Sequence, residues 1–135
     1  MEIAVGSDHA GVLLKRQLAA YLFAEGYQIV DCGTENEEPV DYPDIAEKVA
    51  LEVLKRKIPG ILVCGTGIGV SIAANKIPGI RAALCHDLFT AQLARQHNDA
   101  NILALGGRVL GYSLAFSSVD AFLAETFEAG GRHQV

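Results

Sequence analysis

The residue with the clearest potential for chemistry is Cys64, which stands between an apolar run and a glycine-rich loop. Residues 60–63 read Gly-Ile-Leu-Val, and Cys64 is followed by Gly-Thr-Gly-Ile-Gly. The apolar run is typical of a buried strand, and residues 70–76 resemble the opening of a helix. Unpaired N–H groups and a positive dipole at a helix N-terminus attract an anion, and they can lower the pKa of a nearby thiol toward neutrality. The pattern predicts a usable thiolate beside an anion-binding loop.

Each part of this loop also has a simpler explanation. A free cysteine is commonly a small buried hydrophobe, and Thr66 is either a turn former or a hydroxyl that helps to hold a developing oxyanion. There is no GxGxxG after the first strand and no GxxxxGK[ST], so a dinucleotide or triphosphate site is disfavoured. Cys32 and Cys85 follow strands without a glycine loop, and we interpret both as structural.

Other polar side chains follow predicted strands or glycine pairs. Asp8 and His9 come after the first strand, where they either cap a helix or grip sugar hydroxyls. Tyr42 is either a packing residue or a platform for a sugar ring. Arg108 and Arg132 each follow Gly-Gly, and two such arginines in an acidic chain suit a phosphate.

These residues are positioned by five predicted strands that alternate with five predicted helices. This alternation indicates an α/β fold, a three-layer α/β/α sandwich with a five-stranded parallel, Rossmann-like sheet. We expect the strand order 2-1-3-4-5, because it brings the loop after Ser7 opposite the Cys64 loop at the carboxyl edge, where such sheets bind ligands. The strands are expected at residues 2–6, 27–31, 60–63, 80–84 and 101–105, and the helices at 12–25, about 45–58, 70–76, 87–96 and 113–127.

His97 and Asn98 raise a geometric problem. A helix that begins at Asp87 leaves the carboxyl edge of the sheet, so His97 ends roughly 15 Å from that edge. His97 therefore cannot easily join Cys64 in its own subunit, and the same holds for Arg132 after the last helix. Each is either a surface residue or part of a neighbouring chain's site, in which case the working unit is at least a dimer.

Composition narrows the class of protein. A length of 135 residues, half of them hydrophobic, fits one domain spanning 1–135 with a real core. The net charge of −5 argues against nucleic acid and anionic membranes as partners. No apolar run is long enough for a membrane span, and the N-terminus has no signal-peptide pattern. The three cysteines are odd in number and lack metal-type spacing, so we expect a reduced, cytoplasmic protein.

The motifs together resemble the type B ribose-5-phosphate isomerase and galactose-6-phosphate isomerase family. The resemblance is collinear over nearly the whole chain, and the stretches that carry it are residues 6–11, 41–43, 64–69, 71–76, 79–82, 91–101, 105–108 and 130–133.

The resemblance implies a metal-free and cofactor-free aldose–ketose isomerase that acts through a cis-enediolate. Cys64 would be the base between C1 and C2, and the enediolate would be held by Thr66 and the amides of Gly65, Gly67, Ile68 and Gly69. His97 of a partner subunit would assist ring opening, with Asp8 near the ring oxygen. The phosphate would be bound by His9, Arg108 and Arg132, and a sugar hydroxyl by Asn98.

The substrate remains open at this point. Ribose 5-phosphate is the leading expectation, and galactose 6-phosphate, allose 6-phosphate or a tetrulose phosphate are alternatives, as is a non-catalytic phosphosugar-binding module. Family members often carry a further phosphate-binding arginine four residues after the one that corresponds to Arg132, a position beyond Val135. We expect weaker phosphate binding, another group in its place, or a different substrate. Because the chain itself has Cys64, the base that the resemblance implies, it needs no second kind of subunit to supply one. We therefore expect a self-sufficient homodimer or a dimer of dimers.

Overall fold

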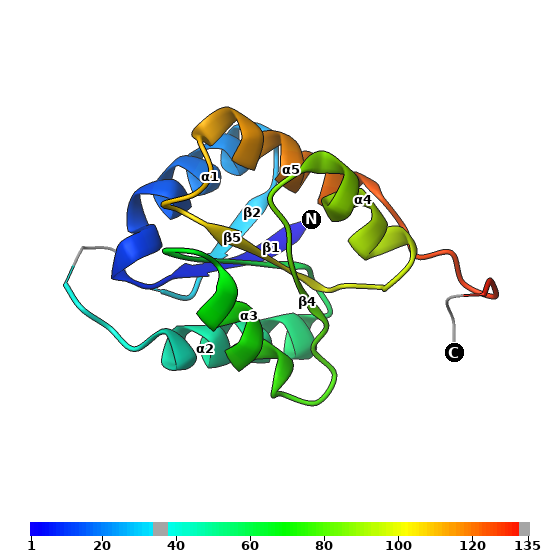
Figure 1. The fold of residues 1–135 in the computed structure, drawn as a ribbon, viewed down its shortest axis with the longest axis horizontal. Helices are drawn as coiled ribbons and strands as arrows, with labels where there is room; N and C mark the ends of the chain where they lie inside the picture. Colours follow the sequence, from blue (N-terminus) through cyan, green and yellow to red (C-terminus); the bar gives the residue numbers. More distant parts are fainter. Residues whose placement is uncertain (34–37, 133–135) are drawn as a thin grey trace.

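A parallel five-stranded sheet lies between two layers of helices in the computed structural model, which describes residues 1–33 and 38–132 (Figure 1). Helices α2 and α3 cover one face, and α1, α4 and α5 cover the other. The predicted α/β sandwich is therefore confirmed. The strands are β1 (Glu2–Ser7), β2 (Gln28–Asp31), β3 (Gly60–Cys64), β4 (Ala82–Leu84) and β5 (Ile102–Gly106). The helices are η1 (His9–Gly11), α1 (Val12–Ala24), α2 (Tyr42–Arg56), α3 (Ile68–Asn75), α4 (Leu88–Gln96) and α5 (Tyr112–Ala124).

The strand order is β2-β1-β3-β5-β4, so the expected order 2-1-3-4-5 is right for the first three strands and wrong for the last two. β5 is buried along its whole length, as an inner strand of a parallel sheet must be. β4 has only three residues, and Leu84 is partly exposed, which suits an edge strand. As a result, β3 pairs directly with β5, and Cys64 lies opposite Gly106.

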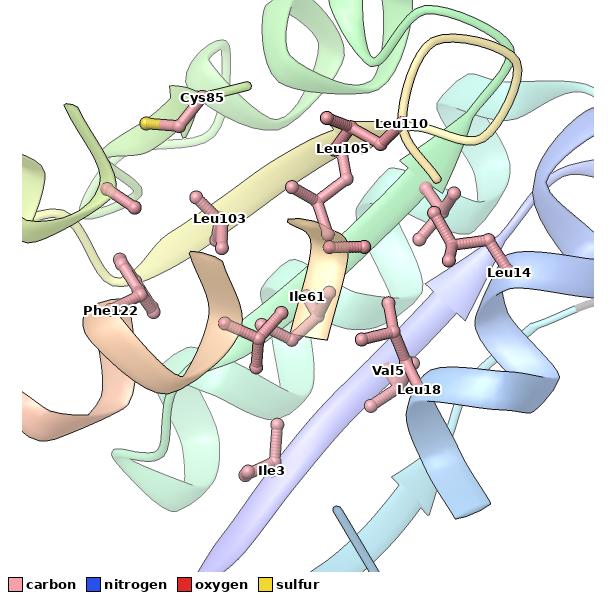
Figure 2. Close-up of a cluster of buried hydrophobic side chains, with 14 of the residues drawn as sticks. Ile3, Val5, Leu14, Leu18, Ile61, Cys85, Leu103, Leu105, Leu110 and Phe122 are labelled. Atoms are coloured by element: carbon pink, nitrogen blue, oxygen red, sulfur yellow. The ribbon is translucent and has the colours of Figure 1, made fainter. Parts of the chain in front are cut away.

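Alternation along the strands divides the core between the two faces of the sheet. Ile61 and Val63 of β3 point toward the cluster under α1, α4 and α5, which also holds Leu103 and Leu105 (Figure 2). Leu62 and Cys64 point the other way, into the cluster under α2 and α3. The period of two therefore places the Cys64 side chain on the α2–α3 face, near the start of α3.

Local signals in the sequence explain several helix ends. Gly26, at φ +98°, follows the end of α1, as expected of a residue just past a helix C-terminus. The Asp87 carboxylate accepts a hydrogen bond from the Thr90 amide at 2.7 Å, which confirms the predicted N-cap of α4. α3 begins at Ile68, two residues earlier than expected, so the glycine loop runs directly into its first turn. No helix in the described part of the chain is long and apolar enough to cross a membrane.

Candidate active site

Cys64 ends β3 with its thiol at the N-terminus of α3. Its side chain is almost fully buried, and the backbone N–H of Gly67 donates a hydrogen bond to Sγ over 3.2 Å. A backbone donor combined with the positive end of a helix stabilises negative charge on the sulfur more than a neutral thiol. The position therefore suits a thiol that gives up its proton during a reaction.

The other two cysteines lie in different surroundings. Burial raises the pKa of the Cys32 thiol to about 11, with Glu52 and Asp31 adding to the effect. Burial also raises the pKa of Cys85. Both thiols stay protonated near neutral pH, which supports the interpretation that they are structural.

The glycine loop is held tightly against β5. Gly67 has φ +81°, and a Cβ on it would lie 2.5 Å from Leu84 Cδ1 and 2.9 Å from the Leu105 carbonyl carbon. A Cβ on Gly106 would lie 2.8 Å from the backbone of Thr66. Contacts this short leave room for glycine alone at both positions, so the loop amides are fixed in place relative to the sheet.

Thr66 is exposed, and its Oγ1 accepts a hydrogen bond from the Ile68 amide at 3.3 Å. This contact fits the turn-forming role considered from the sequence. Because a hydroxyl that accepts one bond can still donate another, Thr66 retains a donor for a ligand on the solvent side of the loop.

The loop after β5 brings Arg108 next to the Cys64 loop. The Gly107 amide donates to the Cys64 carbonyl oxygen at 2.8 Å, and the Arg108 amide donates to the Gly65 carbonyl oxygen at 3.0 Å. The Arg108 side chain runs over Gly65, where an added Cβ would lie 3.6 Å from both Cδ and Nη1. This neighbourhood depends on the pairing of β3 with β5, which the expected strand order did not contain.

The loop after β1 supplies Asp8 and His9. Asp8 is buried, and its Oδ1 accepts from the amides of Ala10 and Gly11 at 2.9 and 3.2 Å, so it caps η1. His9 is half-buried, and its Nδ1 accepts a hydrogen bond from the Val40 amide at 3.2 Å. The structure thus shows the capping role for Asp8, with Oδ1 occupied by the cap.

His9 and Arg108 line one pocket of about 400 Å³, and Gly107 and Tyr112 are among the other residues that line it. An arginine and a histidine that line one pocket form an arrangement that suits a phosphate. Phosphate groups are commonly bound by such convergent donors near the carboxyl edge of a parallel sheet.

Tyr42 begins α2 and flanks the first turn of α3. A Cβ on Gly69 would lie 2.9 Å from its Cε1, so the ring rests directly on that glycine. The ring also lines a groove of about 320 Å³ between α2 and α3 and is 43% exposed. Tyr42 therefore shows the packing role considered from the sequence, and it leaves part of its surface open.

His97, Asn98 and Arg132 lie at the opposite edge of the sheet. α4 begins at the carboxyl edge, and His97 follows its last residue, with Nε2 4.0 Å from Glu128 Oε2. The Asn98 carbonyl oxygen accepts from Arg81 Nε at 2.9 Å, just before β4 begins. Arg132 belongs to the segment after α5, which lies beyond the end of α4 and away from the starts of α1 and α3 (Figure 1). As expected, a single chain does not bring these residues to Cys64; His133, of the same Gly-Gly-Arg-His stretch, lies outside the described residues.

Two residues near the site were not found by the sequence reasoning. Val40 contacts His9 through its backbone, which no side-chain pattern encodes, although its place between two prolines marks a constrained segment. Tyr112 lines the pocket of His9 and Arg108 from the start of α5. Its position four residues after Arg108, where the chain enters a new helix at the carboxyl edge, was the available signal.

Comparison with known proteins adds to this geometry. The family described as Ribose/Galactose Isomerase matches residues 3–135. "Ribose-5-phosphate isomerase B" of Escherichia coli is 52% identical over 134 residues, which cover 98% of this chain and 89% of that protein. "D-erythrulose-4-phosphate isomerase" of Pectobacterium atrosepticum is 45% identical over 97% of this chain and 88% of that protein. The solved structure of Clostridium thermocellum ribose-5-phosphate isomerase B aligns with a TM-score of 0.95 at 54% identity, covering 98% of this chain and 90% of that one. The chain belongs to the ribose/galactose isomerase family.

Proposed function

We propose that this chain interconverts ribose 5-phosphate and ribulose 5-phosphate through a cis-enediolate, with Cys64 as the base and without a metal ion. The observation that carries the proposal is the Cys64 thiol at the N-terminus of α3, where the Gly67 amide donates to its sulfur. The names of the relatives from Escherichia coli and Clostridium thermocellum support the choice of a five-carbon sugar phosphate.

In the aldose-to-ketose direction, the Cys64 thiolate removes the proton on C2. The electrons of that C–H bond form the C1–C2 double bond, and the carbonyl electrons move onto O1, which becomes an enediolate oxygen. The amides from Gly65 to Gly69 and the Thr66 hydroxyl stabilise this charge, which exists only along the reaction. The thiol then returns its proton to C1 as the carbonyl forms at C2 and the O2 proton is transferred to O1. A sulfur base that alternates between thiolate and thiol suits this transfer.

The distal end of the substrate lies in the pocket of His9 and Arg108 in this proposal. Arg108 supplies a permanent charge, and His9 supplies a directional N–H donor. In this proposal the loop amides hold the enediolate, and the side chains of His9 and Arg108, which line a pocket beside the loop, bind the phosphate. Asp8, held rigidly by its capping bonds, and Tyr42 border the sugar between these two ends.

The remaining groups come from a second copy of the chain, so the active unit is a homodimer or a dimer of dimers. His97 of the partner acts as the acid in ring opening, Asn98 binds a sugar hydroxyl, and Arg132 binds the phosphate. Two features support this assembly. These residues lie at the end of the sheet away from Cys64, where the strands begin. Apolar side chains are also exposed around β4, the strand at the side of the sheet. Leu84, Leu88 and Phe89 are 36%, 48% and 67% exposed, as expected of a surface that a second chain covers. We place the protein in the cytoplasm, where its free thiols remain reduced.

The proposal is tested by measuring turnover of ribose 5-phosphate, galactose 6-phosphate, allose 6-phosphate and D-erythrulose 4-phosphate by wild type, Cys64→Ala and Cys32→Ala. Wild type and Cys32→Ala are expected to share a preference for ribose 5-phosphate. Cys64→Ala is expected to lose turnover while binding the phosphosugar within about tenfold of wild type.

Other outcomes have distinct meanings. A preference for D-erythrulose 4-phosphate, which the Pectobacterium relative makes the main alternative, would change the substrate and keep the mechanism. Near-normal turnover by Cys64→Ala would refute the cysteine base. Binding without turnover in the wild type would indicate a non-catalytic phosphosugar-binding module.

A further inference from the structure

We propose that the backbone N–H of Val40 fixes the neutral tautomer of His9, so that His9 presents an Nε2–H donor to the phosphate of the substrate. This inference rests on the proposed function for the identity of the ligand. It goes beyond that function by naming the group that decides which nitrogen carries the proton, and it assigns Val40 as a positioning residue.

The tautomer follows from a hydrogen bond that the imidazole accepts at Nδ1. The Val40 amide nitrogen lies 3.2 Å from His9 Nδ1 and donates its proton to it. In a neutral imidazole, one nitrogen is a donor and the other is an acceptor. Since Nδ1 accepts, Nε2 carries the hydrogen. The opposite tautomer would set two N–H groups against each other and would present a lone pair to the phosphate.

Both partners of this hydrogen bond are held by separate structure. Val40 is half-buried, and its side chain packs against the apolar cluster under α2 and α3. α2 begins only two residues later, at Tyr42. On the other side, Asp8 caps the turn that carries His9 through its bonds to Ala10 and Gly11. The bond therefore joins two fixed segments, which is the arrangement that preorganises a donor.

The position of His9 explains why this tautomer suits phosphate binding. His9 and Arg108 line the same pocket, and guanidinium groups only donate hydrogen bonds. A phosphate has several acceptor oxygens, so the pocket matches it when every facing group donates. An Nε2–H completes that match, whereas an Nε2 lone pair would oppose it.

The tautomer is measured directly by long-range ¹H–¹⁵N NMR of protein labelled at histidine, at about pH 8, where an ordinary imidazole is neutral. The His9 signals are assigned by their loss in His9→Asn. Two variants separate the amide from the side chain. Val40→Pro removes the N–H, while Val40→Ala removes most of the packing and keeps the N–H.

We expect wild type and Val40→Ala to show a protonated Nε2 and an unprotonated Nδ1, and Val40→Pro to show a mixture of tautomers. In Val40→Pro, the KM for the sugar phosphate is expected to rise about tenfold with kcat within about twofold, because one hydrogen bond to the bound phosphate is weakened. The KM of Val40→Ala is expected to change less. Binding of inorganic phosphate, followed through the His9 Nε2 resonance, is expected to weaken in the same order.

A protonated Nδ1 in the wild type would overturn the inference, as would a Val40→Pro variant that keeps the Nε2–H tautomer and the wild-type KM. If Val40→Pro does not fold, the spectra of the wild type and Val40→Ala still decide the tautomer. These spectra need no turnover, so failure of the proposed reaction and failure of this inference are separate results.

Discussion

Gly67 gives the sharpest test of how the glycine loop is built, because two different physical demands meet at this residue. Its φ of +81° is strained for any residue with a Cβ, and the space where a Cβ would go is already filled by Leu84 Cδ1 at 2.5 Å and the Leu105 carbonyl carbon at 2.9 Å. The left-handed backbone costs an alanine about 1 kcal/mol, and overpacking adds about 1–3 kcal/mol. Gly67→Ala is therefore expected to lower the free energy of unfolding by about 2–4 kcal/mol.

Two other glycines separate these contributions. Gly26 has φ +98° but no atom within 4 Å of the added Cβ, so Gly26→Ala reports the backbone strain alone and is expected to cost about 1 kcal/mol. Gly111, at φ −76°, has neither strain nor neighbours, but it is the N-cap of α5, where alanine is less favourable than glycine, so Gly111→Ala is expected to lower the free energy of unfolding by at most about 1 kcal/mol.

Urea unfolding of the three variants, analysed with a common m-value, measures the differences. The same samples report on the site, because relief of the clash at position 67 moves the amide that donates to Cys64 Sγ. We expect Gly67→Ala to lose at least about tenfold in kcat/KM, a loss of about 1.4 kcal/mol in transition-state stabilisation, while Gly26→Ala stays near wild type. If Gly67→Ala is no less stable than Gly26→Ala, the packing argument is wrong. If it keeps full activity despite its loss of stability, the amide at position 67 is not needed for the reaction.

Three further predictions concern separate features of the structure. Arg108→Ala is expected to raise the KM for the sugar phosphate by about tenfold or more with a smaller change in kcat, because it removes a charged donor from the phosphate pocket; an unchanged KM would place the phosphate elsewhere. The hydrogen bond from the Tyr21 hydroxyl to Asp120 raises the pKa of Tyr21 to about 12. Ultraviolet titration of the four tyrosines is therefore expected to show one late ionisation. In Asp120→Ala, this ionisation is expected to move toward the ordinary tyrosine pKa of about 10. Dialysis against a chelator is expected to leave turnover unchanged, and activity that is lost and then restored by a divalent cation would contradict the metal-free mechanism.

The sequence was sufficient for features that depend on local chemistry. The β-branched run before Cys64, the cap at Asp87 and the glycine after α1 each act within a few residues, and each lies where it was expected. The opposite-edge position of His97 was also predictable, because it follows from the length of one helix and the direction of a parallel strand. Residue type, period and helix length decide such features.

Features that depend on which distant segments become neighbours were harder to predict. The expected strand order rests on bringing the loop after Ser7 opposite the Cys64 loop, and this criterion does not distinguish β4 from β5 as the neighbour of β3. The structure places the fully buried β5 there and leaves the short β4 at the edge. The uninterrupted apolar sequence of β5 predicts that the strand is buried on both faces, but it does not predict which strands lie beside it. The bond between Val40 and His9 was beyond reach for a related reason, since its donor is a backbone group common to nearly all residues.

The division of the proposed site between two edges of the sheet leads to a quantitative prediction. In a closed dimer with two-fold symmetry, each site takes Cys64 from one chain and His97 from the other. A heterodimer of Cys64→Ala and His97→Ala then has one site that lacks both groups and one that is fully wild type. Random exchange of subunits from an equal mixture makes about half of the dimers mixed, so the activity is expected to rise from near zero to about a quarter of the wild-type value. If both groups instead act within one chain, every site in the mixture remains defective, and no activity returns even when mass spectrometry shows that the subunits have exchanged. A recovery near one quarter would therefore establish both the shared site and the pairing of one cysteine with one histidine from the partner.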